Sequence, residues 1–96
     1  MVTVTVSLPR VLADTTGGDR SLTVAAPAGT VRSALETLAG SHPLLHRRLR
    51  DEAGALRRYV NVYVDGADIR REQGLETAVT DGATVTVLPS VAGGSR

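Results

Sequence analysis

The residues with the clearest chemical potential in this chain are Gly93 and Gly94, in the stretch VAGGSR near its end. Two successive residues without a Cβ let a peptide lie in a narrow enzyme channel where a side chain would clash. A carboxylate at Gly94 can attack the α-phosphate of ATP to give an acyl-adenylate, which a sulfur nucleophile then displaces. An unhindered glycine carbonyl suits both steps. Because Gly17-Gly18 is an identical pair, the preceding residues must decide whether Gly93-Gly94 is a working end.

Two residues, Ser95 and Arg96, follow Gly94. The carbonyl of Gly94 is therefore part of a peptide bond and has no carboxylate that can attack ATP. If Gly94 is the reactive end, we expect Ser95 and Arg96 to be a removable extension. The alternative is that GGSR comes from a cloning vector.

The other side chains offer little chemistry. The chain has no cysteine, and its only histidines are His42 and His46, which argues against a disulfide framework, a thiolate zinc site or an imidazole metal cluster. Five aspartates lie at predicted turns, where Asp bonds the local backbone, and we expect them to shape those turns: Asp14, Asp19, Asp65, Asp68 and Asp81. We expect no metal site and no catalytic side chain.

Composition sets the broad class. Ninety-six residues, of which 42% are hydrophobic, suffice for one folded domain with an aliphatic core. A net charge of +1 gives no reason to expect nucleic acid or membrane as a partner. No apolar run approaches a membrane span, so the expected location is cytoplasmic. All eleven basic residues are arginine, so no lysine amine is available for acylation.

The elements that must position the glycines begin with a hairpin. Residues 2–7, VTVTVS, alternate between apolar and hydroxyl-bearing side chains and predict a half-buried strand. The stretch DTTGGD predicts a turn in which the two glycines adopt positive φ angles. Residues 21–26 then predict an antiparallel second strand.

A helix is predicted after Thr30, the expected N-cap. Its apolar stripe has helical spacing, and Gly40 is placed to end it. The stripe consists of Val31, Ala34, Leu35 and Leu38. A second short helix is predicted after Pro43, with one face formed by Leu45 and Leu49 and the other largely by Arg47, Arg48 and Arg50.

Three more strands follow by pattern. Residues 59–64, YVNVYV, alternate between apolar and other side chains about the valines and predict a third strand. A short edge strand is expected around residues 68–70. Residues 83–89, ATVTVLP, predict the last strand. Leu75 and Val79 are expected to anchor a connecting turn, with 3₁₀ character. This order predicts an α+β fold of the β-grasp, or ubiquitin-like, type: a mixed sheet of about five strands crossed by one main helix, with a short second helix. The first and last strands would be central neighbours.

The expected organisation is a β-grasp domain over residues 1–89 and a flexible tail over residues 90–96. The residues DGATVTVLPSVAGG, 81–94, together with VTVSLPRVL and RYVNVYVDGADIR, resemble the MoaD/ThiS group of ubiquitin-like sulfur carrier proteins. Within that group the similarity is closest to the actinobacterial CysO-type carriers. The resemblance extends over nearly the whole chain, and LPSVAGG is its most specific part.

The resemblance implies roles for particular residues. Gly94 would be adenylated and then carry the thiocarboxylate, and Gly93, Ala92 and Val91 would lie in the channel of the activating enzyme. Leu88 and Pro89 would contact the partner. The activator would be an E1-like adenylyltransferase of the MoeB/ThiF type that uses ATP and magnesium, while the carrier itself would bind no cofactor.

The resemblance also implies two further partners. A biosynthetic enzyme would accept the sulfur, and for CysO-type carriers this is a cysteine synthase. A JAMM-type zinc peptidase would remove Ser95 and Arg96. The chain would then be a protein co-substrate and not an enzyme, serving the biosynthesis of cysteine or of another sulfur-containing metabolite.

Other functions remain open from the sequence. They are a non-carrier β-grasp interaction module, a protein modifier attached to lysines, and the small subunit of molybdopterin synthase. A cluster of arginines also has two interpretations: a docking surface for an acidic partner, or a solvated face balanced by Asp51 and Glu52, which we favour. The cluster consists of Arg47, Arg48, Arg50, Arg57 and Arg58.

Overall fold

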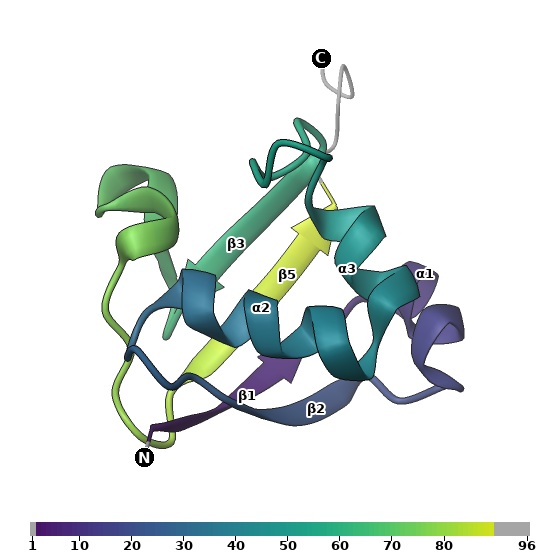
Figure 1. Cartoon of the computed structure of the whole chain (residues 1–96), viewed down its shortest axis with the longest axis horizontal. Helices are drawn as coiled ribbons and strands as arrows, with labels where there is room; N and C mark the ends of the chain where they lie inside the picture. Colours follow the sequence, from purple (N-terminus) through teal and green to yellow (C-terminus); the bar gives the residue numbers. More distant parts are fainter. Residues whose placement is uncertain (1, 90–96) are drawn as a thin grey trace.

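The computed structural model describes residues 2–89. Its centre is a five-stranded mixed sheet, in the order β2-β1-β5-β3-β4, with α2 and α3 packed on one face (Figure 1). The strands are β1 (Thr3–Ser7), β2 (Ser21–Ala25), β3 (Val60–Val64), β4 (Ala67–Asp68) and β5 (Thr84–Pro89). The helices are α1 (Arg10–Ala13), α2 (Val31–Ser41) and α3 (Pro43–Leu49). The predicted β-grasp arrangement is confirmed.

The alternating strand sequences sort the two faces of the sheet. In β1 and β5 every second residue is a valine that is almost completely buried, whereas the threonines between them are half-buried. β1 and β5 run parallel with Val6 opposite Val85, and β3 pairs antiparallel with β5 with Val62 opposite Val87. The first and last strands are therefore central neighbours, as their sequences predicted.

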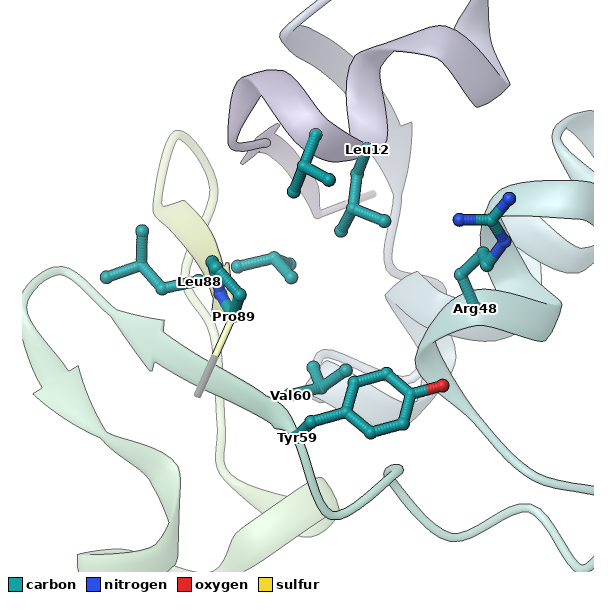
Figure 2. Close-up of a pocket in the computed structure, with 8 residues that line it drawn as sticks. Leu12, Arg48, Tyr59, Val60, Leu88 and Pro89 are labelled. Carbon is teal, nitrogen blue, oxygen red and sulfur yellow. The ribbon is translucent and has the colours of Figure 1, made fainter. Parts of the chain in front are cut away.

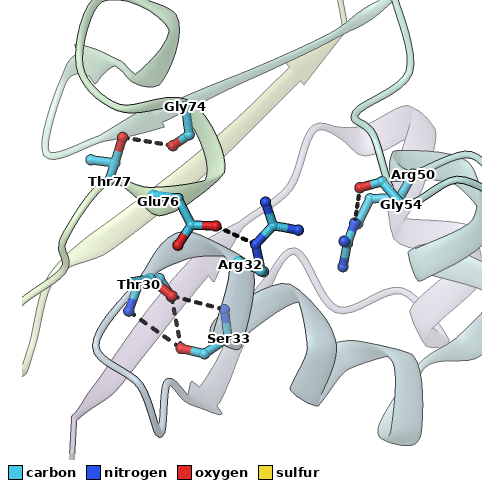
Figure 3. Close-up of polar contacts among 8 residues, drawn as sticks. All are labelled: Thr30, Arg32, Ser33, Arg50, Gly54, Gly74, Glu76 and Thr77. Carbon is cyan, nitrogen blue, oxygen red and sulfur yellow. Dashed lines mark hydrogen bonds and ion pairs between the residues drawn. The ribbon is translucent and has the colours of Figure 1, made fainter.

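Helix α2 covers the valine face. Its predicted stripe is buried without exception, and the N-terminus is closed by a capping box as expected from Thr30. The Thr30 hydroxyl accepts from the Ser33 backbone N–H at 3.2 Å, and the Ser33 hydroxyl accepts from the Thr30 N–H at 3.3 Å (Figure 3). This exchange satisfies N–H groups that the first helical turn leaves without partners.

The end of α2 differs from the prediction. Gly40 lies inside the helix and does not adopt a positive φ; the helix continues to Ser41 and breaks at His42. The physical reason is Pro43, because the ring of a proline disfavours helical geometry in the residue before it. Pro43 then becomes the first residue of α3, whose Leu45 and Leu49 are fully buried.

The connection between β1 and β2 contains more structure than a turn. Helix α1 and a 3₁₀ turn over Asp14–Thr16 precede Gly17 and Gly18, whose φ angles of 72° and 101° are positive as predicted. The sequence prediction missed α1. Pro9 is its N-cap, and the fixed φ of proline favours the entry into a helical turn.

The edge strand is shorter and earlier than predicted. β4 ends at Asp68, and Ile69–Arg71 forms a 3₁₀ turn. The Asp68 carboxylate accepts from the Arg70 backbone N–H at 2.9 Å, which caps the turn, and Ile69 is turned into the core with 1% of its surface exposed. The second predicted 3₁₀ segment is present over Gly74–Glu76.

Within residues 2–89, no helix combines the length and the apolar character that a membrane crossing requires.

Candidate functional site

The end of β5 is held in the middle of the sheet up to its last residue. Leu88 lies opposite Asn61 and Pro89 opposite Val60, so β3 supports the strand as far as Pro89. Leu88 is 43% exposed, and both residues reach the surface at the end of the sheet where α3 also ends (Figure 1). The chain therefore leaves the domain from a fixed base.

The start of β5 is held equally firmly, by aspartates. The Asp65 carboxylate accepts from the Thr84 N–H at 2.9 Å, and the Asp81 carboxylate accepts from the Thr3 N–H at 2.8 Å. Asp65 has a positive φ of 48°. Of the turn aspartates, Asp68 bonds local backbone as predicted, at the Arg70 N–H, whereas Asp65 and Asp81 bond the backbone of strands that are distant in sequence. Among the described residues no group of three potential ligands could hold a metal ion.

Beside the end of β5 lies a pocket of about 190 Å³. Figure 2 shows that α1, α3 and the beginning of β3 enclose it. Its lining is apolar except for the Arg48 guanidinium and the Tyr59 hydroxyl, and comprises Val11, Leu12, Arg48, Tyr59, Val60, Val87, Leu88 and Pro89. The Leu88 side chain extends away from Leu12 and Tyr59, on the other side of β5.

Sequence reasoning placed Leu88 and Pro89 at this site but missed the pocket itself. Val11 and Tyr59 are 61% and 51% exposed, although they come from segments that are apolar by pattern. Two features of the sequence could have indicated these exposed side chains. One is VLA, residues 11–13, a short apolar run soon after Pro9. The other is the alternation of YVNVYV, in which Tyr59 points to the face opposite that of the buried valines. Only the fold brings these segments, 48 positions apart, to one pocket.

The arginine cluster is divided by the structure. Arg47, Arg48 and Arg58 are exposed, and the Arg57 Nε donates to the Arg47 carbonyl at 2.7 Å across the end of α3. Among residues 2–89, no carboxylate lies within ion-pair distance of these four arginines. The Asp51 carboxylate accepts from the N–H groups of Ala53 and Ala55, and Asp51, Glu52 and Arg57 line one surface hollow. The favoured interpretation, a solvated face balanced by Asp51 and Glu52, stays a prediction.

Arg50 does not belong to the exposed face, contrary to the sequence prediction. It is 6% exposed, and its Nε donates to the Gly54 carbonyl at 2.7 Å (Figure 3). The helix has already ended at Arg50, whose φ and ψ of −127° and 147° are extended; helical spacing therefore no longer predicts its direction. Burial, together with the neighbouring Arg50 cation, lowers the pKa of His46 on α3, which favours a neutral imidazole.

Residues 90–96 lie outside the described residues. This range contains the expected adenylation site Gly94, the expected channel residues Gly93, Ala92 and Val91, the expected extension Ser95 and Arg96, and the whole expected tail. For these residues the assignments remain predictions.

Comparison with known proteins extends the sequence resemblance. Residues 6–94 match the ThiS family. The chain is 43% identical over 93 residues to the sulfur carrier protein CysO of Mycobacterium tuberculosis, covering 95% of this chain and 98% of that protein. The crystal structure of M. tuberculosis CysO superposes with a TM-score of 0.83 at 39% identity, over 92% of this chain and 99% of the other.

Two further relatives bear on function. CysO of Amycolatopsis orientalis, whose crystal structure is that of a complex with BexX, superposes with a TM-score of 0.81 at 42% identity and covers 94% of this chain and 98% of that one. Small archaeal modifier protein 3 of Haloferax volcanii is 37% identical over 65 residues, or 68% of this chain and 70% of that protein.

The fold and the supported end of β5 define a ubiquitin-like β-grasp protein whose last strand leads directly into a Gly-Gly sequence. The chain belongs to the ThiS family, and the predicted MoaD/ThiS resemblance is confirmed. Members of this family are small protein carriers and not catalysts.

Proposed function

We propose that this protein carries sulfur as a thiocarboxylate on Gly94. The observation that carries the proposal is the similarity to CysO over 95% of the chain, together with a family match that extends to Gly94. The geometry supports it as well, because Pro89 is anchored in the central strands and only five residues separate Pro89 from the end of VAGG.

The proposed chemistry takes place on the backbone. A carboxylate oxygen of Gly94 attacks the α-phosphate of ATP, and pyrophosphate leaves. A hydrosulfide ion then attacks the acyl-adenylate carbonyl, AMP leaves, and loss of the S–H proton gives the thiocarboxylate. An E1-like adenylyltransferase with ATP and magnesium supplies the catalysis. Gly93, Ala92 and Val91 occupy its channel, while Leu88 and Pro89 contact its surface.

Processing must precede activation in this proposal. With Ser95 and Arg96 attached, Gly94 has no carboxylate, so a peptidase, which we assign to the JAMM-type zinc class, cleaves the Gly94–Ser95 bond. The sulfur is then delivered to a biosynthetic enzyme, and the similarity to CysO favours a cysteine synthase.

Mass spectrometry tests each step. The full chain is incubated with the peptidase and then with the adenylyltransferase, ATP, magnesium and a sulfide source. We expect loss of Ser plus Arg, followed by replacement of one oxygen by sulfur. A chain encoded to end at Gly94 is the control, because it should acquire sulfur without the peptidase. Sulfur on the untrimmed chain would contradict the processing step, and no sulfur on the control chain would contradict the carrier function.

The similarity to small archaeal modifier protein 3 favours one second candidate, attachment of Gly94 to lysines of other proteins. The same activated carboxylate would serve both functions. Isotopically labelled chain ending at Gly94, added with ATP to a host extract, separates them: a modifier yields isopeptide-linked conjugates, whereas a carrier yields the thiocarboxylate and its product.

A further inference from the structure

The pocket beside β5 brings together three of the four exposed large hydrophobic residues found within residues 2–89, namely Val11, Tyr59 and Leu88. Val11 and Tyr59 are 61% and 51% exposed although both are large and largely apolar, and both line the pocket together with Leu12 and Val60. Figure 2 shows Leu12 on one side of the pocket and Tyr59 and Val60 on the other. Of the described residues, only two other large hydrophobic side chains, Leu44 and Leu88, are comparably exposed. This small apolar surface offers a place where one apolar side chain of a partner protein can be buried.

The position of the pocket limits what can cover it. Pro89 lines the pocket and is the last residue before the segment that leads to Gly94. Five residues span at most about 18 Å when fully extended. An enzyme whose active site holds Gly94 must therefore place its own surface close to Pro89, and the channel that encloses the tail shortens this distance further.

The charge around the pocket indicates the chemistry of the contact. Arg48 is exposed at the rim, and none of the described carboxylates pairs with it or with Arg47, Arg57 or Arg58. The two ion pairs within residues 2–89 involve other arginines. A guanidinium at the edge of an apolar pocket suits a carboxylate beside an apolar side chain, because its fork of N–H groups forms paired hydrogen bonds.

We propose that this pocket, on the helix-covered side of the sheet, docks the adenylyltransferase that activates Gly94: an apolar side chain of that enzyme enters between Val11 and Tyr59, and a neighbouring carboxylate binds Arg48. The inference rests on the proposed carrier function and deepens it, since it assigns the recognition of the activating enzyme to α1, α3 and the beginning of β3. The backbone chemistry at Gly94 is then separate from the surface that selects the enzyme.

Steady-state kinetics of adenylation test the proposal, with the chain ending at Gly94 as substrate and the purified adenylyltransferase, ATP and magnesium. A contact that stabilises the enzyme–carrier complex and the transition state equally affects KM and leaves kcat unaltered. We expect Arg48→Glu to raise KM by about tenfold, and Val11→Ser by about threefold, since a lost close charge pair costs more than one methyl-bearing contact. Arg48→Gln should have an intermediate effect.

Two matched variants serve as controls. Arg71→Glu makes the same charge change on an exposed arginine of the 3₁₀ turn after β4, and Leu44→Ser removes an equally exposed apolar side chain that does not line the pocket. Both should leave KM within about twofold of the parent chain, as surface substitutions outside a contact usually do. Circular dichroism and thermal unfolding of each variant verify that the fold is retained.

The outcomes separate the two proposals. Adenylation of the parent chain with unchanged KM for Arg48→Glu and Val11→Ser would overturn the docking pocket and leave the carrier function intact. An equal rise in KM for Arg71→Glu would also overturn it, because net charge and not the pocket would then matter. If Arg48→Glu and Val11→Ser are adenylated normally but deliver sulfur to the acceptor enzyme more slowly, the pocket belongs to the acceptor enzyme and the docking proposal is wrong. A parent chain that is never adenylated would overturn both proposals.

Discussion

Glycines in this chain meet two different physical demands. Gly17 and Gly18 have φ angles of 72° and 101°, with no atom within 4 Å of an added Cβ, so their requirement is conformational and local to the chain. Gly93 and Gly94 are proposed to be required by another protein, whose channel excludes side chains. On this proposal the same residue type supports stability near one end of the chain and reactivity near the other.

Substitution at the two pairs should separate these demands. In the chain ending at Gly94, Gly18→Ala should lower the free energy of unfolding by about 1–2 kcal/mol, the cost of left-handed backbone at a residue with a Cβ, and leave thiocarboxylate formation unchanged. Gly94→Val should leave urea unfolding unchanged and reduce thiocarboxylate formation by roughly a hundredfold, because it displaces the reacting carbonyl. Loss of thiocarboxylate formation by Gly18→Ala, measured under conditions in which the variant is folded, would contradict this division of roles between the two glycine pairs.

A third glycine fits closely against a buried cation. A Cβ at Gly54, where φ is 87°, would lie 3.0 Å from the Arg50 Nη2, whereas a Cβ at Gly66, with a similar φ of 91°, would meet nothing within 4 Å. The two positions thus differ mainly in the contact with Arg50.

Gly54→Ala should therefore destabilise the protein by more than Gly66→Ala, for which about 1–2 kcal/mol is expected from the backbone conformation alone. The difference between them should disappear when Arg50 is replaced by Met, because the crowded guanidinium is then gone. A double-mutant cycle by urea unfolding measures this coupling. Equal losses of stability in Gly54→Ala and Gly66→Ala would show that the Arg50 side chain moves away from the added methyl group without a loss of free energy.

At the scale of elements, α2 is fixed by its first turn and by its neighbours. The capping box closes its N-terminus, and Arg32 forms an ion pair with Glu76 in the 3₁₀ turn Gly74–Glu76 (Figure 3). That turn is held in its own right by the Thr77 hydroxyl, which donates to the Gly74 carbonyl at 2.6 Å. Because the Arg32–Glu76 pair is largely exposed, the cap should matter more than the pair.

Thr30→Ala should lower the free energy of unfolding by about 1 kcal/mol through loss of the N-cap. Thr30→Ser, which retains the hydroxyl, is the matched control and should change the free energy of unfolding by only a few tenths of a kcal/mol. Glu76→Gln, which removes the charge of the ion pair, should cost less than about 1 kcal/mol. A larger effect of Glu76→Gln than of Thr30→Ala in urea unfolding would reverse the expected order.

Helix α3 carries a titratable group that should make stability depend on pH. The pKa of His46 is lowered from 6.5, mainly by burial and then by Arg50, with Glu36 acting in the opposite direction. Above pH 6.5 the imidazole is neutral in both the folded and the unfolded chain. As the pH falls through 6.5 toward the folded pKa, the unfolded chain binds the proton more readily, and folded stability is lost.

His46→Gln should therefore reduce the loss of thermal stability between neutral pH and the range below the folded pKa of His46. Melting temperatures of His46→Gln and of the parent chain across this pH range test the expectation. An unchanged pH dependence in His46→Gln would show that other groups cause it.

At the scale of the whole molecule, one aliphatic core joins the sheet to its helices. Its largest fully buried side chains include Leu35, Leu38, Leu45 and Leu49 from the two helices and Val6, Val85 and Val87 from the central strands. Within residues 2–89 these side chains come from both layers of the fold, so the helices and the central strands share one core.

If residues 90–96 form a tail, as the sequence predicts, a chain truncated after Pro89 should have the same free energy of unfolding as the parent, within about 0.5 kcal/mol, the usual size of a surface change. It should fail completely to form a thiocarboxylate, since it lacks Gly94. Urea unfolding and mass spectrometry measure the two properties on the same sample. A marked loss of stability would contradict the expected division into a domain of residues 1–89 and a tail of residues 90–96.

Much of this molecule follows from local sequence. Alternation in VTVTVS, VNVYV and TVTVL determines which side chains face the core, because successive residues of a strand point to opposite faces. Thr30 and the stripe from Val31 to Leu38 determine the main helix in the same way. The proposed chemistry of the tail was likewise predicted from sequence, because the proposal depends on the backbone of Gly94 and not on side chains that folding brings together.

Tertiary structure decided what spacing could not. Arg50 belongs to the predicted arginine face by spacing but is 6% exposed, and its Nε donates to the Gly54 carbonyl in the loop after α3. The pocket joins Val11, Arg48 and Tyr59, which are far apart in sequence and have no shared pattern. Periodicity describes the surroundings of one element at a time; a surface built from three elements exists only once the sheet and helices have packed and brought them together.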